Sequence, residues 1–288
     1  LYISTHHAVI DGWALVEVRN EILALYPKVL TGFELPDIQS ANVFKEHLAL
    51  ELEASQCEEN ASAWTGLMTG YKSMPILTPL KKVNLKKTNQ ARFKLDETKA
   101  QSINELARKS KVPLKSLLLL AYQRALGDFL NTKSITIDVV TSGRSNRLSE
   151  PLNTIGLYWN ALPLYSDLYD DHDLAITDVT NKLLTMDTYP LYPLSQIRQI
   201  MGEEKTSYAA FNFVNFHNEV VESENREQKG AIDIRYASDR FHYAIKMAVT
   251  GGTNKSDITG TIDFDRGYFT EKDARRLIEM FGNQLSLF

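Results

Sequence analysis

Apolar positions in the first third of the chain recur at helical spacing and predict three helices. The strongest pattern predicts a helix over residues 11–26, behind a short strand over residues 1–6. Its apolar face consists of Leu15, Val18, Ile22 and Leu25. Pro27 is expected to end this helix and start a loop. Two further helices are expected over residues 41–54 and 60–68.

The rest of the pattern mixes strands with helices. Prolines and lysine pairs in residues 71–90 are typical of a linker. A helix capped by Asp96, a buried helix over residues 114–130 and a last helix opened by the capping box Thr270–Asp273 are expected. Further strands are expected over residues 92–95, 135–141, 155–164, 208–216, 232–237, 243–250 and 258–264, and further helices over 174–186 and 194–201.

This order of elements predicts an α/β fold of the α+β two-layer kind, a mixed sheet covered by helices. We expect residues 1–80 to form the end of an N-terminal lobe and residues 81–288 to form a C-terminal lobe.

Composition narrows the class of protein. The chain has 288 residues and a formal net charge of −4, so a global basic field for nucleic acid is absent. No apolar run approaches the roughly 20 residues that cross a bilayer, and no signal peptide is recognisable. A single cysteine, Cys57, excludes an internal disulfide and a multi-cysteine metal site, and fits a cytoplasmic location.

The segment from His6 to Gly12 has the pattern HHxxxDG at a predicted strand-to-helix junction. Adjacent histidines on a strand point to opposite faces, so only one of them can face a reaction channel. Asp11 could bond a nearby histidine or arginine. Gly12 allows a tight turn and a close approach to a substrate, and the new helix offers free N–H groups to developing negative charge.

Histidine suits general-base work because its ordinary pKa lies near 6.5. If the reaction is the attack of an amine on a thioester, the amine must lose a proton. The pKa of a free α-amino group is about 7.7–8.0, so part of the amine is already neutral at cellular pH. Holding the amine and stabilising the tetrahedral intermediate therefore remain open beside proton removal.

Other chemistry has weaker support. A histidine pair can be purely structural, but the Asp-Gly at fixed spacing favours a functional pair. The remaining histidines are scattered without ligand spacing, so we expect no metal. No GxSxG pattern marks a serine nucleophile, and Cys57 lies in an acidic, helix-like segment.

Over nearly its whole length the chain resembles the condensation domains of nonribosomal peptide synthetases. The segment from His6 to Trp13 is similar to their HHxxxDG with its DGW continuation. Ser142–Arg144 resembles their SGR, and Ile155–Leu164 (IGLYWNALPL) resembles their IGxFxNTLPL, with Ala161 in place of threonine. Weaker likenesses lie at Phe44–His47, Asn60–Trp64, Tyr192–Leu194 and Phe211–Phe213.

The resemblance implies two lobes like chloramphenicol acetyltransferase, with a channel between them. It implies amide-bond formation between substrates on donor and acceptor peptidyl carrier proteins, which deliver phosphopantetheine thioesters while the domain itself binds no cofactor. A neighbouring adenylation domain and a role in antibiotic or secondary-metabolite synthesis are also implied. Neither nucleic acid nor membrane is expected as a partner.

The resemblance also implies roles for single residues. The catalytic set is His7, His6, Asp11 and Gly12, with His7 carrying the chemistry and His6 turned away. Asp11 would pair with Arg144, and Gly12 would leave room for the pantetheine arm. Arg144, Asn160 and Trp13 would be structural or line the channel.

Only five residues precede His6, fewer than the family has there, so we expect a chain that begins inside a larger protein and condenses poorly alone. Three other functions stay open. They are a different HHxxxDG acyltransferase, an epimerization domain and a catalytically silent module that recruits carriers.

Overall fold

The computed structural model describes residues 5–6, 8–35, 43–75, 77–80, 88–152, 154–203, 207–214, 243–251 and 258–288. Two compact units are each built from three stretches of chain. Unit 1 comprises Leu1–Tyr71, Val140–Leu162 and Lys182–Thr206, and unit 2 comprises Lys72–Val139, Pro163–Asn181 and Ser207–Phe288. The two expected lobes divide the chain once, at residue 80, whereas each compact unit combines three separate stretches. The lobes therefore remain a prediction.

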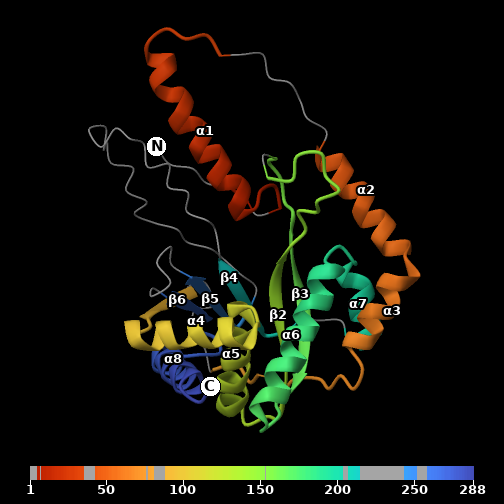
Figure 1. Cartoon of the computed structure of the whole chain (residues 1–288), viewed down its shortest axis with the longest axis vertical. Coiled ribbons are helices and arrows are strands. Elements are labelled where there is room, and N and C mark those ends of the chain that lie inside the picture. Colours follow the sequence, from red (N-terminus) through yellow and green to blue (C-terminus); the bar gives the residue numbers. More distant parts are fainter. Residues whose placement is uncertain are drawn as a thin grey trace. The chain divides into compact units, whose positions relative to one another are not determined.

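A six-stranded sheet has the order β1-β6-β5-β4-β2-β3. Its strands are β1 (Thr88–Lys94), β2 (Ser134–Ser142), β3 (Trp159–Asp167), β4 (Ala209–Val214), β5 (Ile245–Gly251) and β6 (Ile258–Asp265). Strand β4 pairs in parallel with β2 and β5, whereas β6 pairs antiparallel with β5 and β1 (Figure 1). The predicted mixed sheet is therefore confirmed.

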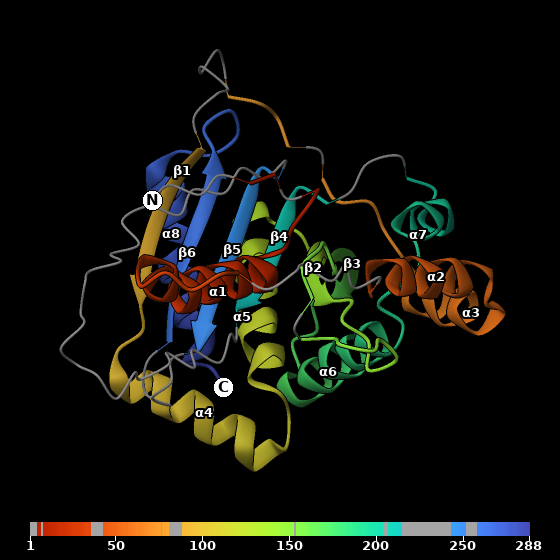
Figure 2. The ribbon, with the colours of Figure 1, turned by 90° about the horizontal axis from the view of Figure 1, so that it is seen from above.

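Helices α5 (Leu114–Leu130) and α8 (Glu271–Leu285) form the core of unit 2 with strands β1, β6, β5 and β4, which lie side by side in Figure 2. Helix α8 packs against β1 and β6, where Phe281 lies 5.5 Å from Phe93 between ring centroids. Tyr122 of α5 stacks on Phe211 of β4 at 6.1 Å. Helix α5 is buried continuously from Ser116 to Gly127, which explains why most of its residues are apolar; Ser116, Gln123 and Arg124 are buried polar exceptions.

Local capping follows the sequence closely. Asp96 accepts a hydrogen bond from Lys99 N at 2.8 Å and begins α4 (Glu97–Ser110). Thr270 and Asp273 form the complete capping box that begins α8. Both expected helix starts are confirmed, because a side chain that accepts orphan N–H groups is a local signal.

Unit 1 contains α1 (Gly12–Leu30), α2 (Val43–Gln56), α3 (Glu58–Leu67) and α7 (Leu194–Met201), while α6 (His172–Thr188) belongs partly to each unit. The predicted break at Pro27 is wrong, because α1 includes this proline and continues to Leu30. Proline's fixed φ suits a helix, and in this exposed part of α1 water can bond the carbonyl that loses its N–H partner.

The strand predicted over residues 155–164 begins later, at Trp159. Backbone groups just before it bond elsewhere: Gly156 O accepts from Asp11 N at 2.9 Å, and Tyr158 N donates to Asp11 Oδ2 at 3.1 Å. The predicted strand over 232–237, and residues 1–4 of the predicted first strand, lie outside the described residues. Within the described part, no helix is both long and apolar enough to cross a membrane.

Candidate active site

The HHxxxDG segment leads into the first turn of α1. Asp11 is the N-cap of the helix, its Oδ1 accepts from Ala14 N at 2.7 Å, and Gly12 is the first helical residue. The side chain of His6 is exposed, and its Nδ1 accepts from Ala8 N at 3.0 Å. His7 lies outside the described residues. The expected link between the motif and a helix start is therefore present.

Asp11 and Arg144 form a buried ion pair within unit 1. Arg144 Nη2 lies 3.0 Å from Asp11 Oδ1 and 3.1 Å from Oδ2. The two side chains are only 4% and 6% exposed. With the bonds from Ala14 N and Tyr158 N, four donor contacts reach one carboxylate. This is the pairing that the family resemblance implies, and it fixes the turn before α1.

One part of the chain, residues 151–152 and 154–158, holds both partners of the pair through its backbone. The carbonyls of Pro151 and Thr154 accept from Arg144 Nη1 at 2.8 and 3.2 Å. The same stretch supplies the Gly156 carbonyl and the Tyr158 amide that bond Asp11. We call this stretch the holding loop. It satisfies buried donors and acceptors that would otherwise be costly to bury.

Tyr158 is a site residue that the sequence did not single out. Its ring centroid lies 4.4 Å from Arg144 Cζ, a cation–π distance, and its hydroxyl lies 2.7 Å from Thr154 Oγ1. Phe44 and His47 of α2 contact the same ring at 5.7 and 4.8 Å between centroids. The one sequence signal for Tyr158 is that it is an aromatic residue inside the IGLYWN segment. Its partners Arg144, Phe44 and His47 lie in other segments of the chain.

Two other expected site residues have simpler surroundings. Trp13, in the first turn of α1, donates from Nε1 to the Leu152 carbonyl at 2.9 Å. Asn160 lies half-buried in β3, and its Oδ1 accepts from Ala161 N at 2.9 Å. Trp13 thus also contacts the holding loop, whereas this hydrogen bond of the Asn160 side chain is local.

Gly143, which follows β2, has no space for a side chain. An added Cβ would clash with the Tyr158 carbonyl and lie 3.0 Å from Leu191 Cδ2 and 3.2 Å from His47 Cε1. We expect Gly143→Ala to lower the free energy of unfolding by about 1–3 kcal/mol in urea denaturation. Gly66→Ala in α3 is the control, because nothing lies within 4 Å of its added Cβ. Equal losses in both variants would contradict the account.

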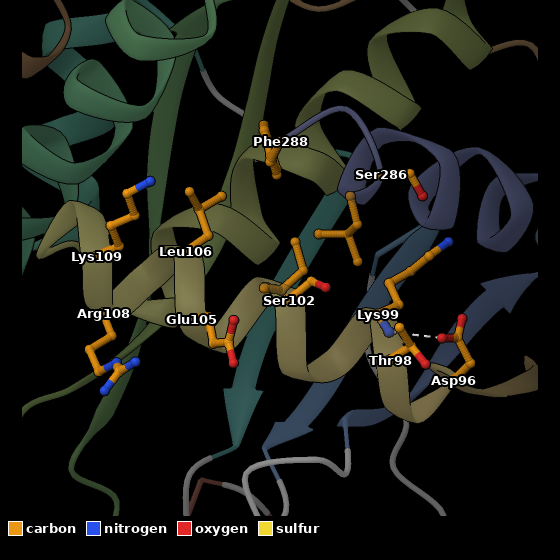
Figure 3. Close-up of a pocket in the computed structure, with 12 residues that line it drawn as sticks. Asp96, Thr98, Lys99, Ser102, Glu105, Leu106, Arg108, Lys109, Ser286 and Phe288 are labelled. Carbon is orange, nitrogen blue, oxygen red and sulfur yellow. Dashed lines mark hydrogen bonds between the residues drawn. The ribbon is translucent and has the colours of Figure 1, made fainter.

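A separate pocket lies in unit 2, and Figure 3 shows residues that line it. Its volume is about 920 Å³. It is lined by α4 and the end of the chain, including Lys99, Ile103, Leu106, Leu285 and Phe288. No motif residue lines it. Among the described residues, no group of three or more His, Cys, Asp or Glu side chains could hold a metal ion.

Several known proteins are similar to this chain. The AMB antimetabolite synthetase AmbE of Pseudomonas aeruginosa is 28% identical over 253 residues, covering 87% of this chain and 12% of that protein. Bacitracin synthase 3 of Bacillus licheniformis is 21% identical over 285 residues, covering 96% of this chain and 4% of that protein. The chain thus spans a small part of these relatives' length.

A solved structure confirms the fold. The condensation domain from the Monacolin K polyketide synthase MokA superposes with a TM-score of 0.73 at 19% identity, covering 98% of this chain and 68% of that chain. The family model named Condensation domain matches residues 1–287. The chain therefore belongs to the condensation-domain family, as its HHxxxDG and IGLYWNALPL segments predict.

Proposed function

We propose that this chain forms an amide bond between two carrier-bound substrates in a nonribosomal peptide synthetase. The observation that supports this proposal most directly is the intact HHxxxDG segment, whose aspartate forms a buried ion pair with Arg144. Membership of the condensation-domain family and similarity to synthetases such as AmbE support the same reaction. A silent module would need the Asp11–Arg144 pair for its fold, but it would not need the two histidines of the motif.

In this reaction the acceptor amine attacks the carbonyl carbon of the donor thioester. A C–N bond forms, the C–S bond breaks, and the donor's pantetheine thiol leaves with the proton that the amine loses. We assign His7 to holding the amine and accepting its proton. The N–H of Ala14 at the start of α1 already donates to Asp11 Oδ1, so we assign it no part in holding the charge of the tetrahedral intermediate.

The other site residues act around His7 in this proposal. The buried pair of Asp11 with Arg144 fixes the turn that carries the motif. Gly12, the first residue of α1, leaves room for the pantetheine arm, and Trp13 and Asn160 support the channel. His6, exposed in the structure, has no direct part in the chemistry.

The proposed partners are a donor and an acceptor peptidyl carrier protein, with an adenylation domain nearby. Phosphopantetheine arrives on the carriers, and the proposal assigns no cofactor to the chain itself. A cytoplasmic location, where these carriers are loaded, belongs to the same proposal.

The test supplies the protein, at its full natural length, with two loaded carrier domains. The donor carries N-acetyl aminoacyl thioesters in L and D forms, the acceptor carries aminoacyl thioesters, and both sets cover the proteinogenic residues. Intact-protein mass spectrometry should detect a dipeptidyl thioester on the acceptor carrier.

Two parallel readouts separate the rival functions. In D₂O, exchange of the donor α-hydrogen without a dipeptide would point to epimerization and contradict the proposal. Carrier binding without any product from the whole panel would point to a silent module and would contradict it equally.

A further inference from the structure

The contacts around Arg144 converge on one tyrosine side chain. Tyr158 is 1% exposed, its ring lies under the Arg144 guanidinium, and its amide donates to Asp11. Tyr158 therefore contacts both partners of the buried pair, by ring and by backbone, and lies at the end of the holding loop.

The Tyr158 hydroxyl links the two ends of residues 154–158, the last part of the holding loop. It lies 2.7 Å from Thr154 Oγ1, and Thr154 is 7% exposed. The Thr154 carbonyl in turn accepts from Arg144 Nη1 at 3.2 Å. The hydroxyl bond therefore ties together the two ends of a short stretch whose carbonyls and amide hold Arg144 and Asp11. The similar family segment IGxFxN has phenylalanine at this place, so the hydroxyl distinguishes this chain from that pattern.

Two side chains of α2 also pack against Tyr158. The ring of Phe44 forms a T-shaped pair with it at 5.7 Å between centroids, and the ring of His47, 3% exposed, lies 4.8 Å away. Gly156 gives Phe44 and Tyr158 room to approach, because an added Cβ would lie 2.9 Å from Phe44 Cδ2 and 2.8 Å from Tyr158 Cε2. A buried ring that packs against Arg144, Phe44 and His47 can set the position of the guanidinium.

We propose that Tyr158 is a positioning residue for the motif and that its hydroxyl bond to Thr154 sets the holding loop. Through Arg144 and Asp11, this bond determines how firmly residues 8–11, the turn before α1, are held. The inference rests on the proposed function for its effect on rate, but its effect on the turn stands independently.

The test compares matched variants in the full-length protein. Thr154→Val and Tyr158→Phe each remove one hydroxyl and leave the other buried without its partner, whereas Thr154→Ser keeps the bond. Tyr189→Phe is the control, since it removes a hydroxyl bond of 2.6 Å to Glu59 elsewhere in unit 1. Two quantities are measured: the single-turnover rate of dipeptidyl thioester formation at saturating carriers, and hydrogen exchange of the peptide over residues 11–16.

We expect Thr154→Val and Tyr158→Phe to slow single turnover roughly fivefold and to speed exchange in residues 11–16 by a similar factor. Thr154→Ser and Tyr189→Phe should stay within about twofold of wild type, and combining Thr154→Val with Tyr158→Phe should recover part of the loss. Unchanged exchange in both hydroxyl variants would overturn the inference. If wild type forms no product, the proposed function fails, and the exchange data alone decide the role of Tyr158.

Discussion

Asp11→Ala is expected to lower the free energy of unfolding by about 3–5 kcal/mol. The change removes both contacts to Arg144 and the acceptor for Ala14 N and Tyr158 N. Arg144, 6% exposed, would then be a buried charge without its counter-ion. Urea denaturation read by pulse proteolysis gives the loss directly, and the effect on activity should follow from the displaced turn.

Two further variants separate charge from capping in this prediction. Asp11→Asn keeps an oxygen for Ala14 N but loses the charge, so its loss should be smaller than that of Asp11→Ala. Arg144→Met leaves Asp11 unpaired and should also destabilise strongly. Asp11→Asn with Arg144→Met should lose less than the two single losses together, because no unpaired charge remains. A loss below about 1 kcal/mol for Asp11→Ala would mean that the pair does not brace the turn.

The sequence predicted those parts of the fold that local chemistry determines. Asp96 and the Thr270–Asp273 box begin helices where expected, because an N-cap needs only its own next three residues. Helix α5 was predicted from a mostly apolar run, and it is buried throughout from Ser116 to Gly127. At Pro27 the local signal misled, since water can bond the carbonyl that loses its N–H partner in this exposed part of α1.

In the candidate site, too, the sequence predicted what local patterns determine and missed contacts between distant segments. The Asp11–Arg144 pair joins residues 133 positions apart, and only the family resemblance pointed to it. Residues 155–158 of the holding loop were predicted as the start of a strand, because IGLYWN has strand-like composition. The backbone groups of Gly156 and Tyr158 instead bond Asp11, a partner distant in sequence that no local pattern reveals. Tyr158 was missed for the same reason: its partners Arg144, Phe44 and His47 belong to other segments.

His7→Ala is expected to slow amide-bond formation roughly 10²- to 10⁴-fold, the range that a positioned acid–base group supplies. If proton removal dominates, raising the pH toward the α-amino pKa of about 7.7–8.0 should recover part of the rate, because more amine is already neutral. If holding the amine dominates, the loss should persist across this range. The pH profile of the single-turnover rate distinguishes these two roles.

The central claim is that this chain joins two carrier-bound substrates at the HHxxxDG motif. The most direct measurement is the single-turnover rate of dipeptidyl thioester formation on the acceptor carrier, made with the protein at its full natural length as wild type, His7→Ala and His6→Ala. We expect product from wild type, at least about a hundredfold slower product from His7→Ala, and a loss below about tenfold for the exposed His6. Equal rates for wild type and His7→Ala would contradict the account.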